Sequence, residues 1–136
     1  MVAKLLFVQP VMKPHILFVD DDAKLCELLS LYFNSRGFDV TTAINGAQAR
    51  SLMDQARFDL AVLDVNLGGE SGLDVLDFVK SKCPALPVLM FTGTDVDEDL
   101  VRKTLRGRAE GIMHKTGSLE GLLTAIRWHL AKATAS

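Results

Sequence analysis

The sequence predicts a doubly wound α/β domain, with a five-stranded parallel sheet covered by helices on both faces. Short apolar segments alternate with longer segments whose apolar residues recur at helical spacing, and this alternation is typical of parallel strands joined by helical crossovers. Two glycines, Gly68 and Gly69, and several aspartates follow the apolar segments and mark their ends. The expected strands are residues 15–19, 39–43, 60–63, 88–91 and 111–115.

The apolar content of the strands predicts their places in the sheet. The first, third and fourth expected strands are almost entirely apolar, as strands buried on both faces are. The second contains Asp39, Thr41 and Thr42, and the fifth contains His114. Edge strands tolerate polar residues because one side of each faces water, so we expect these two at the edges. Right-handed crossovers then favour the strand order 2-1-3-4-5.

The connections between the strands predict five helices. Leu25, Leu28, Leu29 and Tyr32 recur at i, i+3, i+4 and i+7 and predict a helix over 22–36, with an N-cap at Asp22. The other helices are expected after Gly46, after Ser71, at 95–108 and after Ser118.

Length and composition limit the class of protein. A chain of 136 residues with 49% hydrophobic and 24% charged residues fits one globular domain. The net charge of −2 does not favour direct binding of nucleic acid. Cys26 and Cys83 lack metal-site spacing, and no apolar run could span a bilayer, so a cytoplasmic protein is expected. We expect an extension of unknown role at 1–13, the domain at 14–133 and a tail at 134–136.

Reactive side chains gather at one edge of the predicted sheet. Asp20 and Asp21 follow the first strand, Asp64 follows the third, Thr92 follows the fourth and Lys115 ends the fifth. The carboxyl ends of parallel strands share one rim, where open α/β sheets bind their ligands. Three neighbouring carboxylates repel one another unless a cation neutralises them. An all-oxygen site of this kind suits Mg²⁺, with Mn²⁺ as an alternative.

The same residues favour phosphoryl chemistry. Asp64 would be the nucleophile and form an acyl phosphate, a role that carboxylates play elsewhere. Lys115 would neutralise one phosphoryl oxygen and the Thr92 hydroxyl would hydrogen-bond another, because phosphoryl transfer depends on positioning and charge neutralisation. The chain has no GxxxxGK[ST] or GxGxxG motif.

On these residues the sequence resembles the receiver domains of two-component response regulators, a flavodoxin-like family that includes the chemotaxis regulators. The resemblance covers residues 15–131. The matching positions are the acidic pair Asp20 and Asp21, the phosphoacceptor Asp64, a glycine at Gly72, the switch hydroxyl of Thr92 and the signature lysine Lys115.

The resemblance implies a set of metal ligands. The side chains of Asp21 and Asp64 and the backbone carbonyl of Asn66 would ligate Mg²⁺, and Asp20 would act mostly through water. Asn66 and Thr94, two residues after the acceptor and the switch threonine, would flank the path of attacking water and tune the lifetime of the acyl phosphate.

The resemblance also implies a signalling switch. The domain would take its phosphoryl group from a phosphohistidine of a sensor histidine kinase or histidine phosphotransfer protein. It would dephosphorylate itself slowly rather than turn over a separate substrate. Output would pass to a partner protein or to an output domain of a longer chain. The helix that ends near Arg106, the strand 111–115 and the helix after Ser118 would form a partner or homodimer face, although its basic residues equally suit a solvated surface.

Three departures from the family pattern concern signalling rather than the acceptor. Gly68 and Thr116 stand where prolines are common, and Ile112 replaces an aromatic residue. A cis peptide before Thr116 is not expected, because a non-proline cis bond costs about 3 kcal/mol. Ile112 supports an alternative hypothesis, a phosphorylation-independent interaction scaffold with the same fold. A phosphatase acting on small phosphoesters is a third and weaker hypothesis.

Overall fold

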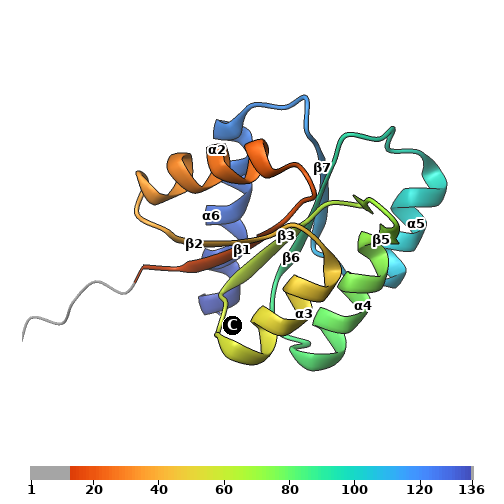
Figure 1. Cartoon of the computed structure of the whole chain (residues 1–136), viewed down its shortest axis with the longest axis horizontal. Helices are drawn as coiled ribbons and strands as arrows, with labels where there is room; N and C mark the ends of the chain where they lie inside the picture. Colours follow the sequence, from red (N-terminus) through yellow and green to blue (C-terminus); the bar gives the residue numbers. More distant parts are fainter. Residues whose placement is uncertain (1–12, 136) are drawn as a thin grey trace, which may run out of the picture.

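The main sheet has the predicted topology. The computed structural model describes residues 13–135; residues 1–12 of the expected extension and Ser136 of the expected tail lie outside the described residues. All paired strands of the main sheet are parallel, in the order β2-β1-β3-β6-β7, which is the predicted order 2-1-3-4-5 with the two more polar strands at the edges (Figure 1). The strands are β1 (His15–Val19), β2 (Asp39–Ala43), β3 (Leu60–Leu63), β6 (Val88–Thr92) and β7 (Gly111–His114).

Helices cover both faces of this sheet. In the described part of the chain α2 and α6 pack on one face, and α3, α4 and α5 lie on the other (Figure 1). Each lies in one of the predicted connections, or after the last strand. None of these described helices has the length and apolar character needed to cross a membrane. The helices are α2 (Ala23–Asn34), α3 (Gly46–Gln55), α4 (Gly72–Lys82), α5 (Glu98–Arg106) and α6 (Leu119–Ala135).

Two cores explain why the central strands read as unbroken apolar runs. Successive side chains of a strand point to opposite faces. Leu17 and Val19 of β1 therefore pack in the core under α3 and α4, and Ile16 and Phe18 pack in the core under α2 and α6. All four side chains are buried. Apolar and polar residues do not alternate in these strands because the sheet is buried on both faces.

Helix starts follow the predicted caps. The Asp22 carboxylate accepts hydrogen bonds from the backbone N–H groups of Lys24 and Leu25, and the Ser71 hydroxyl accepts one from Leu73. Because the N-cap residue lies outside the helix, α2 begins at Ala23, and it ends at Asn34, slightly inside the predicted range 22–36. No cis peptide bond occurs among the described residues, in agreement with the prediction for the bond before Thr116.

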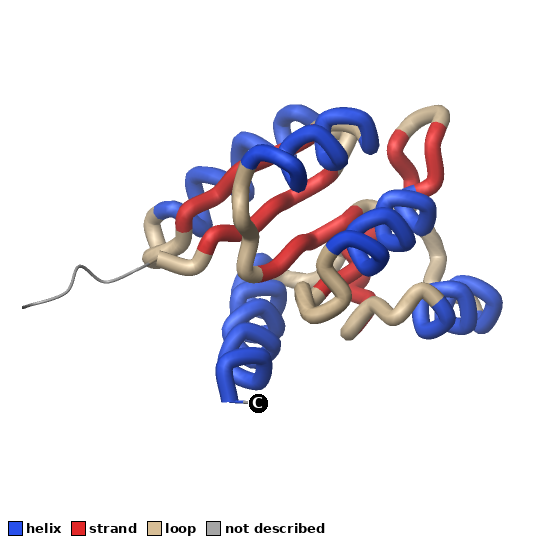
Figure 2. Tube along the Cα trace, turned by 90° about the horizontal axis from the view of Figure 1, so that it is seen from below, coloured by secondary structure: helices blue, strands red, loops and turns tan. Residues whose placement is uncertain are grey.

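A short β-hairpin between β3 and α4 corrects one expectation. The sequence predicted only a loop after Asp64, whereas β4 (Asn66–Leu67) and β5 (Glu70–Ser71) pair antiparallel. Figure 2 shows this hairpin as a separate pair of strands beside the start of α4. Gly68 has a φ of +67°, a conformation that glycine adopts without strain at the first position of a two-residue turn. Strands of two residues are too short to show alternation in a sequence.

An ion pair between Lys80 and Glu110 lies where β6 and β7 begin, at the amino ends of the strands. Lys80 of α4 is buried, and its ammonium donates to the backbone oxygen of Leu86 (2.8 Å) and to the Glu110 carboxylate (2.5 and 3.1 Å). The same carboxylate accepts the backbone N–H of Val88 at 2.8 Å. Glu110 thereby satisfies the first donor of β6 and joins α4 to the start of β7. This lysine carried no signal in the sequence.

We expect Gly72→Ala to lower the free energy of unfolding by about 3 kcal/mol. The backbone N–H of Gly72 donates to the Val65 oxygen at 2.6 Å, and a Cβ at position 72 would overlap the backbone oxygen of Asp64. Urea unfolding measures the effect. Gly69→Ala is the matched control, because a Cβ there meets nothing within 4 Å, and it should change stability by less than about 0.5 kcal/mol. Equal losses in the two variants would contradict the steric argument.

Candidate acidic site at the carboxyl end of the sheet

The fold brings the predicted site residues to one rim. Asp20 follows β1, Asp64 follows β3, Thr92 ends β6 and Lys115 follows β7. Parallel pairing continues past the strands at this rim, since Asp64 N–H donates to the Val19 oxygen at 2.9 Å and Lys115 N–H to the Thr92 oxygen at 2.8 Å. These backbone bonds fix the relative heights of the side chains above the sheet.

Three carboxylates form a compact cluster. One oxygen from each of Asp20, Asp21 and Asp64 lies within 4.8 Å of the others. Asp20 and Asp64 are buried, with 3% and 5% of their surfaces exposed, whereas Asp21 is exposed. The cluster therefore has a buried floor and an open mouth, through which a small charged group can enter from solvent.

Lys115 supplies the positive charge that faces this cluster. Its ammonium lies 2.6 Å from Asp20 Oδ2 and 2.9 Å from Asp64 Oδ2. Burial favours the neutral amine, but the hydrogen bonds to Asp20 and Asp64 outweigh it and raise the pKa of Lys115. Lys115 therefore carries its charge across the physiological range and neutralises part of the repulsion between the two buried carboxylates.

Lys115 does not cancel all of the repulsion between Asp20 and Asp64. Desolvation raises the pKa of the Asp20 carboxyl, and the negative charge of Asp64 adds to the effect, although hydrogen bonds from Lys115 and from the backbone N–H of Asp22 act in the other direction. A further positive charge near these carboxylates would therefore stabilise their ionised forms. Carboxylate oxygens with an open, solvent-facing side fit a hard divalent cation such as Mg²⁺ or Mn²⁺.

The hairpin forms a wall beside the carboxylates. Asn66 N–H donates to Asp64 Oδ1 at 3.2 Å, and a Cβ added at Gly68 would lie 3.8 Å from the Asp21 carboxylate. An ion pair between Glu70 and Arg50 of α3, 2.6 Å long, joins the hairpin to the body of the domain. Sequence reasoning missed this pair, because the two residues lie 20 positions apart and no pattern in the sequence links them.

Gly46 leaves room for the Glu70 side chain against the start of α3. A Cβ at Gly46, the first residue of α3, would overlap the Glu70 carboxylate. A glycine at a helix start, next to an Asn N-cap, was an available signal for a close neighbour, but the sequence did not say which segment approaches. The wall of the acidic site is thus held from α3 as well as from β3.

Thr92 lies under the rim but does not bond to the carboxylates. Its side chain is fully buried, its hydroxyl is 2.8 Å from the Thr94 hydroxyl, and the hydroxyl oxygen accepts the Thr94 backbone N–H at 3.1 Å. Thr94, which the sequence predicted to flank the site, is therefore the present partner of Thr92. The threonine is positioned at the site and is held by its own loop.

Cys26 is a neighbour that sequence reasoning did not find. Its thiol donates to the backbone oxygen of Asp20 at 3.3 Å, and burial together with the charges of Asp20 and Asp22 raises the pKa of this thiol. The contact supports the turn after β1. No spacing in the sequence distinguished this cysteine from an ordinary core residue.

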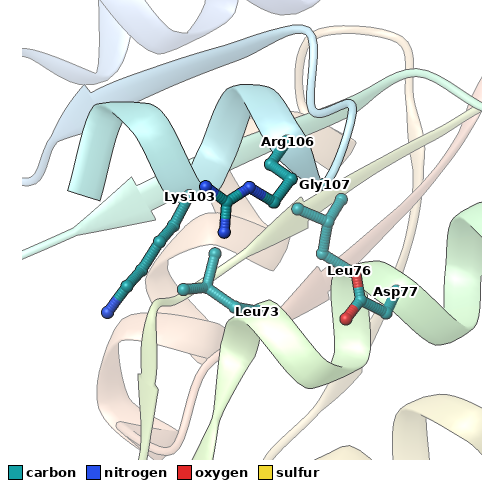
Figure 3. A pocket seen from close by; sticks show the side chains of 6 residues that line it. All are labelled: Leu73, Leu76, Asp77, Lys103, Arg106 and Gly107. Atoms are coloured by element: carbon teal, nitrogen blue, oxygen red, sulfur yellow. The ribbon is translucent and has the colours of Figure 1, made fainter. Parts of the chain in front are cut away.

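A small hollow lies away from the acidic site, between α4 and α5 (Figure 3). Leu73 and Leu76 of α4 face Lys103 and Arg106 of α5 across a volume of about 180 Å³. Asp99 and Lys103, spaced i, i+4 on α5, form an ion pair at 3.0 Å. None of the predicted site residues lines this hollow.

The family of the chain follows from its match to known domains. Residues 16–127 match the model of the response regulator receiver domain. The chain belongs to the response regulator receiver family. It is 37% identical over 112 residues to the probable transcriptional regulatory protein TcrX of Mycobacterium tuberculosis, an alignment that covers 82% of this chain and 47% of TcrX. This receiver domain thus spans about half the length of the curated relatives that it matches.

Solved structures agree with this assignment. The receiver domain of a putative LuxO repressor from Vibrio parahaemolyticus has a TM-score of 0.83 at 26% identity, covering 91% of this chain and 95% of that one. The BeF₃-activated receiver domain of RstA from Klebsiella pneumoniae has a TM-score of 0.78 at 27% identity, with coverages of 85% and 97%. The fold and the two-component signalling class of this receiver domain are therefore those expected from its sequence.

In metal-free buffer at pH 7 we expect Asp20→Asn to be more stable to urea than the wild type. The folded-state pKa of Asp20 is raised above its ordinary value of 3.8, so the ionised carboxylate lowers stability as the pH rises through the folded pKa. An asparagine at position 20 does not ionise, so it causes no such loss of stability. The difference should narrow as the pH falls through the folded pKa toward 3.8.

The control for this experiment is Asp22→Asn. Asp22 is the neighbouring exposed N-cap, and asparagine caps helices about as well as aspartate, so a change below about 0.5 kcal/mol is expected. A pH-independent gain in Asp20→Asn, or an equal gain in Asp22→Asn, would contradict the role given to desolvation at Asp20.

Proposed function

We propose that this receiver domain accepts a phosphoryl group on Asp64 from a phosphohistidine, in a Mg²⁺-dependent reaction, and that phosphorylation changes its partner binding. The observation that carries the proposal is the arrangement around Asp64. Its carboxylate is buried beside Asp20 and Asp21 and lies 2.9 Å from the Lys115 ammonium. A scaffold that did not use the site would gain nothing from this crowding of charge, which costs stability.

The metal ligands of this proposal are the side chains of Asp20, Asp21 and Asp64 and the backbone carbonyl of Asn66, with Asp20 acting mostly through water. Mg²⁺, or Mn²⁺ in its place, would neutralise charge between the carboxylates and a phosphoryl oxygen. Of these residues Asp21 is exposed to solvent, whereas Asp20 and Asp64 are buried. In the absence of the ion Lys115 is the only cation that the structure places against Asp20 and Asp64 in its described part.

The acceptor step is a displacement at phosphorus. A carboxylate oxygen of Asp64 would form the new O–P bond as the N–P bond of the phosphohistidine breaks, and the histidine would leave with its electron pair. Lys115 would exchange a carboxylate contact for a phosphoryl oxygen. Asn66 N–H, which already donates to Asp64 Oδ1, would hold the carboxylate in a fixed orientation during the approach.

The switch would depend on whether the Thr92 hydroxyl hydrogen-bonds to Thr94 or to a phosphoryl oxygen on Asp64. It now bonds with Thr94, and a phosphoryl oxygen on Asp64 would offer a stronger, charged acceptor. A contact made in only one state biases two pre-existing conformations of a domain. Movement of Thr92 would reach β7 through the backbone bond to Lys115, and there Ile112 packs partly buried against the core where the family often has an aromatic residue.

Partners follow from the family and from the exposed surface. A sensor histidine kinase or histidine phosphotransfer protein would donate the phosphoryl group in the cytoplasm, and a partner or an output domain would receive the signal. TcrX is named as a transcriptional regulatory protein, so a gene-regulatory output is consistent with the likeness. Val101 and Leu105 of α5 and Trp128 of α6 are exposed, and they would contribute to a homodimer or partner face built on α5, β7 and α6. Direct contact of this domain with nucleic acid or a membrane forms no part of the proposal.

Incubation with Mg²⁺ and acetyl phosphate should add the mass of one phosphoryl group to the intact chain. Asp64→Asn should abolish the adduct, because an amide cannot form the acyl phosphate, and so should removal of the metal with EDTA. Intact-protein mass spectrometry measures each case.

The control for the acceptor is Asp74→Asn, which removes an exposed carboxylate from the first turn of α4 and should leave the adduct unchanged. An adduct that persists in Asp64→Asn would show that another residue is the acceptor. A folded wild-type domain that binds Mg²⁺ but forms no adduct would instead favour the interaction scaffold.

Asp21→Asn should weaken Mg²⁺ binding by about tenfold or more, because affinity for hard cations depends on the charge of the ligand set. Titration calorimetry on the unphosphorylated domain measures this directly, without reference to activity. Asp22→Asn removes an adjacent carboxylate that caps α2, and it should change the affinity by less than about twofold. Equal weakening by both variants would mean that general negative potential, rather than a ligand at position 21, holds the ion.

A further inference from the structure

The hairpin beside the acidic cluster is short and forms a sheet of its own (Figure 2). Its strands β4 and β5 have two residues each, paired as Asn66 with Ser71 and Leu67 with Glu70. An isolated two-stranded hairpin is marginally stable at best in water. Contacts with the rest of the domain must therefore hold it in place, and these contacts also decide where Asn66 lies.

The pair of Leu67 and Glu70 provides two such contacts. Side chains of directly opposed residues lie on the same face of a hairpin. Leu67 is buried in the core under α3 and α4. The Glu70 carboxylate lies 2.6 Å from the guanidinium of Arg50 on α3. An apolar contact thus anchors β4, and an ion pair anchors β5.

Arg50 is held from two sides. Besides its contact with Glu70, its guanidinium lies 5.8 Å from the centre of the Phe78 ring on α4, within the range of a cation–π contact. The side chains of Arg50 and Glu70 are 33% and 31% exposed. Salt and water screen a partly buried pair of this kind less than a pair on the open surface. The guanidinium is therefore a fixed point to which the hairpin is attached.

The Glu70 carboxylate also lies against the first residue of α3. A Cβ at Gly46 would overlap this carboxylate and would lie 2.9 Å from a guanidinium nitrogen of Arg50. The start of a helix carries a partial positive charge, which favours a carboxylate there. A glycine at the helix start and an arginine one turn later thus surround one glutamate of the hairpin.

We propose that Arg50 and Glu70 are positioning residues for the metal site, and that their ion pair holds the hairpin in the orientation in which the Asn66 carbonyl ligates Mg²⁺. The inference rests on the proposed function, in which Asn66 is a ligand. Asn66 N–H donates to Asp64 Oδ1 at 3.2 Å, so a hairpin that swings away from α3 moves both the carbonyl and this donor. In this role the ion pair acts through Asn66.

The positive charge of Arg50 allows a test by the sign of the effect. If only the long-range potential of Arg50 mattered, removal of this cation would strengthen Mg²⁺ binding. If the ion pair holds the hairpin, its removal weakens Mg²⁺ binding. Arg50→Met removes the charge and keeps a long side chain against Phe78. We expect it to weaken Mg²⁺ binding by about threefold or more in titration calorimetry on the unphosphorylated full chain.

Two further variants separate the ion pair from other effects. Arg50→Lys keeps a cation within reach of Glu70 and should bind Mg²⁺ within about twofold of the wild type. Lys82→Met is the matched control, because Lys82 lies 5.9 Å from the centre of the same Phe78 ring and pairs with Asp54 of α3. That pair joins α4 to α3 without the hairpin, so its loss should change Mg²⁺ affinity by less than about 1.5-fold.

Hydrogen exchange tests the hairpin without a metal. In metal-free buffer the backbone amides of residues 66–71 should exchange about threefold or more faster in Arg50→Met than in the wild type, whereas those of β3 should keep their rate. Lys82→Met should match the wild type in both segments. An equal acceleration in β3 would mean a general loss of stability and would contradict a role specific to the hairpin.

The two measurements distinguish failure of this inference from failure of the proposed function. A folded wild type that binds no Mg²⁺ would contradict the proposed function, and with it any positioning of a metal ligand. A wild type that binds Mg²⁺, together with Arg50→Met that binds it equally well or more tightly, would overturn only the role of the ion pair. Unchanged exchange of residues 66–71 in Arg50→Met would overturn that role as well.

Discussion

The ammonium of Lys115 between Asp20 and Asp64 is the contact on which the acidic end of this domain depends. The two carboxylates come from different strands, and both are buried, so without a nearby cation their repulsion would oppose the folded arrangement. Lys115 can reach them only because β7 pairs with β6 and places its last residues at the same rim. The parallel sheet is thus the means by which one positive charge meets two negative ones.

The charged side chains are paired more completely at the amino ends of the strands than at the carboxyl ends. At the amino ends of the strands, the Lys80 ammonium and the Glu110 carboxylate satisfy each other and two backbone groups, which makes a closed network. At the carboxyl ends, one lysine contacts two of the three clustered carboxylates, Asp20 and Asp64, and the pKa of Asp20 is raised mainly by burial. Such incomplete compensation is typical of sites where function rather than stability sets the residues. The charges are therefore fully paired at the amino ends of the strands and only partly compensated at the carboxyl ends.

The hairpin after Asp64 turns at Gly68, a position where the family often has a proline. Gly68 supplies a positive φ instead of a fixed negative one, and it lets two short strands pair beside the acidic cluster. A glycine turn is more flexible than a proline turn. The ion pair between Arg50 and Glu70, whose carboxylate lies against Gly46, joins the hairpin to α3.

The sequence by itself determined the sheet order, the helix positions and the rim on which Asp20, Asp64, Thr92 and Lys115 lie. It could do so because burial on both faces leaves unbroken apolar runs, and because parallel strands all end at one edge. Only the tertiary structure decided which side chains are in contact: the pair of Lys80 with Glu110, the hairpin joined to α3 by Glu70, and the hydrogen bond between the Thr92 and Thr94 hydroxyls. These contacts depend on side-chain positions across elements, and no periodicity within one segment records them.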